Sequence, residues 1–126
     1  MSVTAIDHHE SMPVAICERR QFDRAALRAL CSYDEHLRVV VEAADGGELL
    51  ERLADDEHLV ILVGRSTLRQ EGPGLVGRIR SALPRARIVL VGIADELAPA
   101  SAIDMGADGF LPRDGDLAEQ LAAVYG

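Results

Sequence analysis

Glycines, hydroxyls and thiols are the groups in this chain whose types and spacing suggest chemistry. The segment 72–77 reads Gly-Pro-Gly-Leu-Val-Gly and matches the GxGxxG pattern, whose glycines let a pyrophosphate approach a helix N-terminus. That pattern should directly follow the first strand of a βαβ unit, whereas residues 64–71 separate it from the nearest predicted strand. We interpret residues 64–71 as a loop into a helix, and we expect no dinucleotide site.

The hydroxyl and thiol groups also lack the neighbours that catalysis or metal binding requires. No histidine is placed to act as a base for Ser66 or Thr67, so we interpret both as loop hydroxyls. Cys17 and Cys31 form no CxxC motif, and no hydrophobic signal sequence precedes them. We therefore expect two buried, reduced thiols in a cytoplasmic protein, and neither a metal nor another cofactor.

The overall composition limits the classes of function. The 126 residues are 48% hydrophobic and 27% charged, which fits one globular domain, and no repeat or linker divides them. The net charge of −8 repels phosphate backbones and anionic membranes. The longest apolar runs are far shorter than the roughly 20 residues that cross a bilayer. We expect a soluble domain that binds neither nucleic acid nor a membrane directly.

From residue 13 onward, short apolar runs alternate with amphipathic segments, as in buried parallel strands covered by helices. The expected strands are residues 14–17, 38–42, 59–63, 88–91 and 109–111. Five βα repeats predict an α/β fold: a flavodoxin-like, doubly wound parallel sheet with strand order 2-1-3-4-5. We expect one domain over residues 13–126 after a flexible tail of residues 1–12, with sites at the carboxyl ends of strands one, three and four.

Each expected helix has an apolar face directed at the sheet. The faces of the first three helices consist of Phe22, Ala25, Ala26 and Leu30; Leu49, Leu50 and Leu53; and Leu75, Val76, Ile79 and Leu83. Asp45 is the expected N-cap of the second helix, and Pro84 ends the third. A short fourth helix is expected over residues 99–105 and a fifth over residues 115–124.

Three motifs resemble those of the receiver domains of two-component response regulators, and the resemblance covers residues 14–124. Residues 42–46 read Glu-Ala-Ala-Asp-Gly, residues 78–80 read Arg-Ile-Arg before a Leu-Pro pair, and residues 106–111 read Gly-Ala-Asp-Gly-Phe-Leu. The sequence as a whole, and the Glu-Ala-Ala-Asp-Gly motif in particular, is similar to receivers that precede helix-turn-helix output domains. The resemblance implies a signalling role, with a C-terminal DNA-binding output domain in a longer chain.

The resemblance also implies five functional positions, and this chain departs from the family at four of them. The family has two acidic residues after strand one, a phosphoacceptor aspartate ending strand three, a Ser or Thr ending strand four, and a lysine after strand five. The matching positions here hold Glu18 and Arg19, Gly64, Gly92 and Arg113. Phe110 matches the aromatic that reports the conformational state in the family, although a strand phenylalanine is more often a core residue.

A pocket so altered should not support aspartyl phosphorylation. Gly64 offers no carboxylate oxygen, and Arg19 puts a positive charge where Mg²⁺ would bind, so we expect no metal. Arg19, Arg65 or Arg113 could pair with Glu18, because a buried lone carboxylate is unfavourable. Solvated, unpaired arginines are the alternative.

We therefore expect a non-enzymatic, phosphorylation-independent regulatory domain that acts through protein–protein contacts, with a protein partner or a homodimer. Dimers of similar receivers form through the last helix or the fourth-helix face. The alternative is a receiver-like sensor that binds a small anionic ligand in the altered pocket, using Arg19, Arg65 and Arg113. An enzyme on this fold would need a nucleophile with its base, which the sequence lacks.

Overall fold

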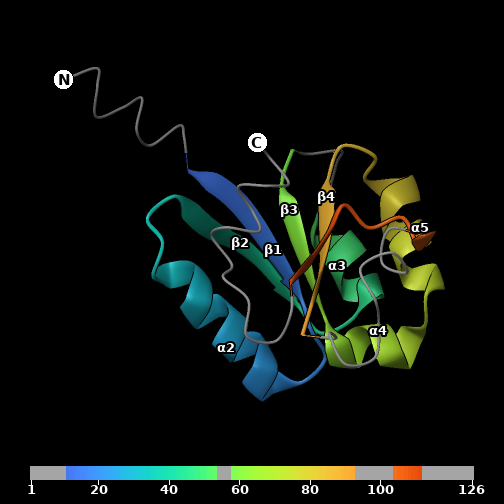
Figure 1. Ribbon diagram of the computed structural model, residues 1–126, viewed down its shortest axis with the longest axis horizontal. Coiled ribbons are helices and arrows are strands. Elements are labelled where there is room, and N and C mark those ends of the chain that lie inside the picture. The colour runs from blue at the N-terminus through green and yellow to red at the C-terminus, as the bar shows by residue number, and fades with distance from the viewer. Residues whose placement is uncertain (1–10, 54–57, 93–103, 112–126) are drawn as a thin grey trace.

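A five-stranded, all-parallel sheet lies at the centre of the computed structural model (Figure 1). The structure describes residues 11–53, 58–92 and 104–111. The strands are β1 (Met12–Cys17), β2 (Leu37–Ala43), β3 (Val60–Gly64), β4 (Arg87–Val91) and β5 (Gly109–Leu111). Their order, β2-β1-β3-β4-β5, confirms the predicted flavodoxin-like topology.

The central strands are apolar along their whole length because both of their faces are covered. All five residues of β3 are buried, and so are the last four of β1. At the edge of the sheet, β2 is less buried: its first six residues are partly buried or exposed, and only the last, Ala43, is buried. This contrast is typical of a parallel sheet with helices on both sides.

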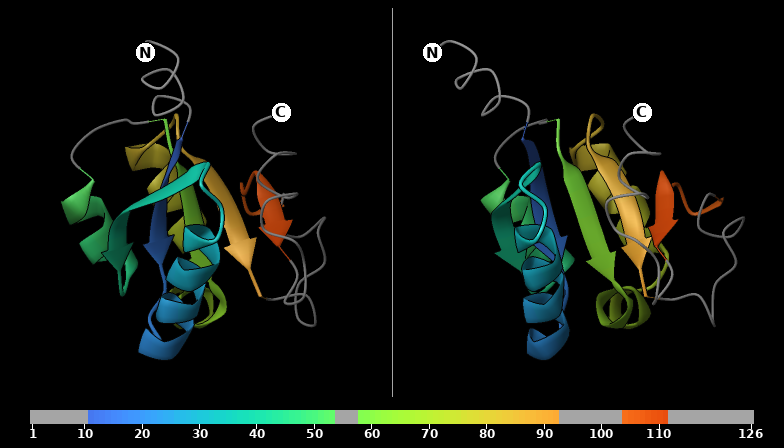
Figure 2. Two further views of the ribbon diagram at one scale, coloured as in Figure 1. Left: turned by 90° about the vertical axis from the view of Figure 1, so that its left-hand side faces the viewer. Right: turned by 60° about the vertical axis from the view of Figure 1, so that its left-hand side comes forward.

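The helices of the described residues lie on both faces of the sheet (Figure 2). The described helices are α2 (Gln21–Ser32), α3 (Gly46–Arg52), α4 (Arg65–Glu71) and α5 (Gly74–Ala82). Leu27 and Cys31 of α2 pack with Val14 and Ile16 on one face. The apolar residues of α3, α4 and α5 join the larger core on the other face.

The second and third predicted helices are confirmed as α3 and α5. Asp45 caps α3 as expected, since its Oδ1 accepts a hydrogen bond of 2.8 Å from the amide of Glu48. Leu49 and Leu53 are buried and Leu50 is partly buried against the same core. The predicted face of α5 is buried too: Leu75, Val76, Ile79 and Leu83 are each at most 2% exposed.

The predicted sheet-facing side of the first helix was wrong. In α2 the buried residues are Leu27 and Cys31, whereas Phe22 is 86% exposed and Leu30 is 49% exposed. The helix carries apolar residues on two opposite sides, so periodicity alone could not choose between them. In the observed orientation Leu27 and Cys31 pack on β1, and the Arg24 guanidinium donates to the carbonyl of Glu18 at 2.8 Å.

The prediction of a loop before the third helix was also wrong, because α4 occupies residues 65–71. Leu68 of α4 packs into the core, and Gly72, with φ of 82°, ends the helix. The GxGxxG segment therefore follows a helix rather than a strand, which removes the context that dinucleotide binding requires.

Two of the receiver-like motifs meet at the amino-terminal edge of the sheet. Arg80 of α5 forms an ion pair with Asp108 and donates to the carbonyl of Ala86 at 2.6 Å. Asp108 also accepts from the amide of Ile88 at 2.9 Å, and its own amide donates to the Ile88 carbonyl at 2.8 Å. These residues tie α5, β4 and β5 together, so their contribution is structural.

Several expectations fall outside the described residues. The fifth predicted helix and nearly all of the fourth do, together with residues 1–10 of the predicted tail; β1 itself begins at Met12. Within the parts that are described, no helix has the length and apolar character needed to span a membrane.

Candidate functional site

The carboxyl ends of β1 and β3 bring the first two candidate residues together. Cys17 pairs with Val63 in the parallel register, so the next residues, Glu18 and Gly64, lie side by side. The amide of Glu18 donates to the carbonyl of Ala43 at 2.9 Å, which holds it against β2 as well. The Glu18 residue is only 1% exposed, so this glutamate lies inside the sheet end and not on the surface.

The carboxylate of Glu18 occupies the space that a side chain at position 64 would need. A Cβ added to Gly64 would lie 2.0 Å from Oε1 of Glu18, 2.7 Å from its Cδ and 2.8 Å from its Cγ. These distances are well inside van der Waals contact. Gly64 has φ of −79° and ψ of 161°, a conformation open to any residue, so the glycine is required by space and not by backbone strain.

The two oxygens of this carboxylate have different environments. Oε2 accepts a hydrogen bond from the amide of Arg20, two residues further along the chain. Oε1 is buried and has no hydrogen-bond partner among the described residues. A buried carboxylate oxygen without a partner is unfavourable, because desolvation is not offset by a new bond.

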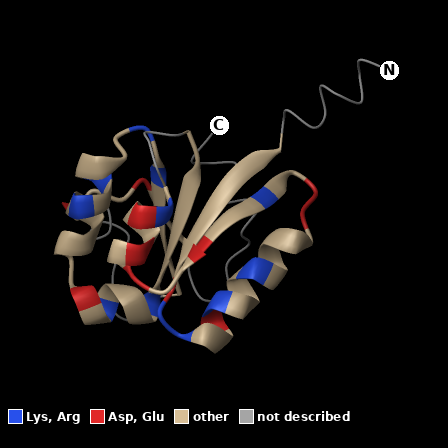
Figure 3. Ribbon diagram, turned by 180° about the vertical axis from the view of Figure 1, so that it is seen from behind, with Lys and Arg blue, Asp and Glu red and all other residues tan. Residues whose placement is uncertain are grey.

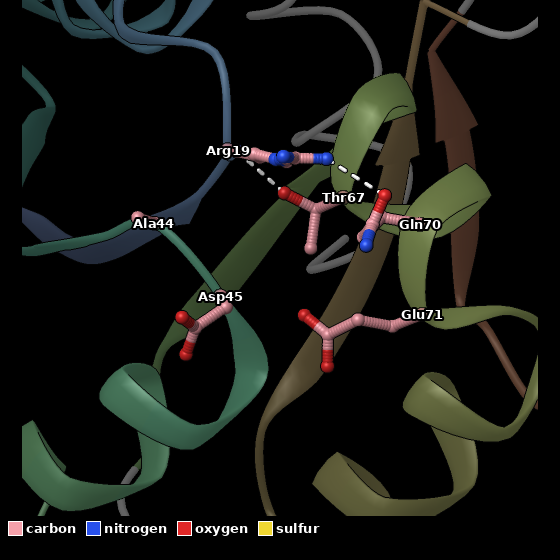
Figure 4. A pocket seen from close by; sticks show the side chains of 6 residues that line it. All are labelled: Arg19, Ala44, Asp45, Thr67, Gln70 and Glu71. Atoms are coloured by element: carbon pink, nitrogen blue, oxygen red, sulfur yellow. Dashed lines mark hydrogen bonds between the residues drawn. The ribbon is translucent and has the colours of Figure 1, made fainter.

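The side chain of Arg19 points toward α4 (Figure 4). Its guanidinium donates to the Gln70 side-chain oxygen at 2.7 Å, and its amide donates to Oγ1 of Thr67 at 2.6 Å. Arg19, one of the three arginines that could pair with Glu18, therefore does not pair with it. Thr67 is fully buried in α4, so its interpretation as a loop hydroxyl was wrong; it fastens the β1–α2 connection to α4.

A cavity of about 560 Å³ opens beside Arg19, between the ends of β1 and β2 and the helix α4 (Figure 4). Its lining consists of Arg19, Ala44, Asp45, Thr67, Gln70 and Glu71. Glu71 accepts from the Gly46 amide at 2.9 Å and pairs with Arg78 on its other side. Two carboxylates against one arginine give this cavity little attraction for an anion.

The other predicted site residues are distributed as follows. Gly92 follows β4 with φ of 76°, a left-handed conformation that favours glycine, and no atom of the described residues lies within 4 Å of the place of a Cβ. Phe110 is partly buried and packs against the larger core. Arg65 begins α4 next to Gly64, and Arg113 lies outside the described residues.

The residues present do not fit the Mg²⁺ ion that receivers hold. Gly64 supplies no side-chain oxygen, Arg19 replaces one acidic residue, and the carboxylate of Glu18 fills the space that a side chain at position 64 would need. Within residues 11–53, 58–92 and 104–111, no group of three His, Cys, Asp or Glu side chains is arranged to hold a metal.

The two cysteines are buried free thiols. Burial raises the pKa of Cys17 to about 12, with a further contribution from the nearby carboxylate of Glu71. Burial likewise raises the pKa of Cys31 to about 11. Neither thiol is therefore an activated nucleophile at neutral pH.

No protein-family profile matches this sequence. Among characterised proteins, it is 31% identical over 115 residues to the nitrate/nitrite response regulator NarP of Escherichia coli, covering 88% of this chain and 52% of NarP. A second relative is a protein-glutamate methylesterase/protein-glutamine glutaminase of Nitratidesulfovibrio vulgaris, 28% identical over 79% of this chain and 28% of the relative. The chain thus spans about half of the first relative and less of the second.

Solved structures show the same architecture. The isolated receiver domain of RcsB from Salmonella enterica serovar Typhimurium, in its apo form, superposes with a TM-score of 0.76 at 26% identity, covering 91% of this chain and 88% of that one. This chain is a response-regulator receiver domain. A LuxR-family DNA-binding response regulator from Silicibacter pomeroyi shares the fold of the domain, with a TM-score of 0.68 at 22% identity over 90% of this chain and 89% of that one.

The sequence did not indicate how Glu18 and Gly64 fit together. A glycine at the acceptor position was visible in the sequence, but the carboxylate that replaces its side chain comes from another strand. Thr67 and Gln70, which hold Arg19, were also missed, because no pattern marks a helix over residues 65–71.

Proposed function

We propose that this receiver domain signals without being phosphorylated, as a non-enzymatic module of the cytoplasm that acts through protein–protein contacts in transcriptional regulation. The single observation that carries the proposal is the placement of Glu18 over Gly64. Phosphoryl transfer needs a carboxylate oxygen in line with the donor and a metal that neutralises the developing charge. The pocket has neither an acceptor at position 64 nor room for one.

Glu18 itself is a poor substitute for the missing acceptor. Its Oε2 is engaged by the Arg20 amide, and its Oε1 is directed at Gly64 inside the protein, where a phosphodonor has no access. A carboxylate that is already fixed in the pocket also keeps the local charge constant. The domain should therefore hold one state, whatever the concentration of phosphodonor.

Relatives support the regulatory context. NarP is named as a response regulator, and RcsB structures that share the fold include complexes with DNA. We propose that this domain likewise works beside a C-terminal DNA-binding output domain in a longer chain, with direct DNA contact left to that domain. The acidity of the receiver domain, with a net charge of −8, is consistent with this division.

The test is to incubate the domain with Mg²⁺ and acetyl phosphate, and separately with Mg²⁺ and BeF₃⁻. Intact-mass spectrometry and amide NMR spectra are then recorded. The receiver domain of RcsB, whose structure has been solved in the presence of BeF₃⁻, is the positive control. We expect no added phosphoryl mass and no shifted resonance in this domain. A phosphorylated carboxylate, on Glu18 or elsewhere, would refute the proposal.

The alternative of a small anionic ligand at Arg19, Arg65 and Arg113 remains a prediction with less support. Arg19 is held by Gln70 in a cavity that Asp45 also lines. Thermal-shift measurements with phosphate, sulfate and di- or tricarboxylates test it directly. A saturable rise in melting temperature that Arg65→Gln removes would favour this second function.

A further inference from the structure

The outer face of α2 carries an apolar stripe that the described residues leave exposed. Phe22 is 86% exposed and Tyr33, the residue just after the helix, is 88% exposed; between them lie the exposed residues Ala26 and Ala29. In a helix these four positions fall on one side, because their spacings of four, three and four residues follow the heptad repeat. Leu30, 49% exposed, widens the stripe.

This stripe lies opposite the side by which α2 packs on the sheet. Leu27 and Cys31 face the core at 7% and 1% exposure, and they are half a turn away from Ala29 and Tyr33. Three of the four large exposed apolar residues in the described parts of the chain belong to this face; Val40 of β2 is the fourth. Contiguous apolar residues of this kind mark interaction surfaces.

The pattern along α2 is complementary to itself when it is reversed. Suppose that a second α2 lies antiparallel to the first, with the two-fold axis midway between Ala26 and Ala29. Ala26 of each copy then faces Ala29 of the other. The same alignment puts Phe22 of each copy beside Tyr33 of the other. Large residues then flank a close approach of small ones, as helix packing requires.

The charges at the ends of the helix follow the same alignment. The exposed Arg20 precedes α2 and the exposed Glu35 follows it, both just outside the helix; in an antiparallel pair the end of each helix near Arg20 lies toward the end of the other near Glu35. Figure 3 shows the basic loop before the helix and the acidic loop after it. Both charges oppose the dipole of their own helix but complement the dipole of an antiparallel neighbour.

We propose that the outer face of α2 is an isologous interface between two copies of this receiver domain. A C₂ pair needs one self-complementary patch, and this face supplies apolar, small and charged residues in a symmetric order. The inference rests on the proposed contact function and names the partner, a second copy. It places the contact on the first helix of the domain and not on the last helix or the fourth-helix face.

The dimer should be weak. A helix of 12 residues is about 18 Å long, and a pair of such helices buries less than a standard protein–protein interface. We expect a dissociation constant on the order of tens of micromolar, with association driven by the two aromatic residues.

Sedimentation velocity over low-micromolar to near-millimolar protein measures the association. The wild-type domain should shift from monomer to dimer, and Ala26→Glu should remain monomeric. Ala82→Glu, the same change at an exposed position of α5, is the matched control and should dimerise normally. Arg20→Glu alone and Glu35→Arg alone should each weaken the dimer at least threefold, and the double variant should recover the wild-type constant.

Cross-linking defines the orientation. A mixture of Ala26→Cys and Ala29→Cys chains should form a mixed disulfide in preference to either symmetric one. The native thiols should not interfere, because they are buried and burial raises the pKa of Cys17 and Cys31. A monomer at all concentrations, a dimer that survives Ala26→Glu, or preferential Ala26→Cys self-pairing would each overturn the inference. A monomer that also resists phosphorylation would leave the proposed function standing, with another protein as the partner.

Discussion

Adding a single methyl group at Gly64 tests the relation between this position and Glu18. In Gly64→Ala the new Cβ would lie 2.0 Å from Oε1 of Glu18, so the carboxylate must move. Moving it gives up the hydrogen bond from the Arg20 amide, and hydrogen bonds to charged groups contribute about 1.5–3 kcal/mol. Part of that loss is offset, because Oε1 leaves a buried place where it has no partner among the described residues.

We expect the effect of Gly64→Ala on the free energy of unfolding to have opposite signs in the wild-type and Glu18→Ala backgrounds. With Glu18 present, we expect Gly64→Ala to lower the free energy of unfolding by about 2 kcal/mol, within the range for overpacked cores. In the Glu18→Ala background the space is free and the backbone conformation suits alanine, so the same change should raise it by about 0.5 kcal/mol. The coupling energy is then about 2.5 kcal/mol.

Urea denaturation of the four proteins, followed by circular dichroism, provides these free energies. Gly77→Ala is the matched control: its Cβ would meet no atom of the described residues within 4 Å, and alanine should stabilise α5 in both backgrounds alike. Equal effects of Gly64→Ala with and without Glu18 would show that the carboxylate does not occupy the acceptor space. The structural basis of the proposed phosphorylation independence would then fail.

Three further perturbations follow from the contacts of single residues. Asp45→Ala removes the N-cap of α3 and should lower the free energy of unfolding by about 1 kcal/mol in urea denaturation, whereas Asp45→Asn should be nearly neutral. Asp108→Ala removes the acceptor of the Ile88 amide and of Arg80, and it should lower the free energy of unfolding by about 2 kcal/mol. Arg80→Ala leaves the hydrogen bond from the Ile88 amide intact, so it should lower the free energy of unfolding by less in the same assay. Because the pKa of Cys17 is about 12 in the folded protein against 9.0 for an ordinary thiol, its contribution to stability is complete below pH 9 and is lost as pH rises toward 12. Unfolding free energies measured over that interval should therefore fall more steeply for the wild type than for Cys17→Ala, and equal slopes would contradict the raised pKa.

The fold was predictable from the sequence because its signals are local. Buried parallel strands need continuous apolar runs, and the runs in β1, β3 and β4 are recognisable without any knowledge of their neighbours. The number of βα units and the handedness of their connections then leave few sheet orders. Asp45 and the face of α5 were predictable for the same reason, since capping and helical periodicity involve residues within one or two turns.

The sequence did not determine which of two apolar sides α2 would bury. Both stripes satisfy the helical period, and the choice between them depends on contacts with distant parts of the chain: Leu27 packs against β1, and Phe22 faces solvent. Similarly, the residues of α4 lack a clear apolar period, and the helix is stabilised by contacts with distant parts of the chain: Leu68 in the core and Thr67 with the Arg19 amide.

What the sequence by itself determined about the site was the absence of an acceptor at Gly64. Only the tertiary structure decided what fills the space beside Gly64, which is the carboxylate of Glu18. Glu18 and Gly64 are far apart along the chain, and they meet because parallel pairing aligns the carboxyl ends of β1 and β3. Steric exclusion between a carboxylate and a side chain acts over a few ångströms in space. It therefore cannot be read from the positions of the two residues in the sequence.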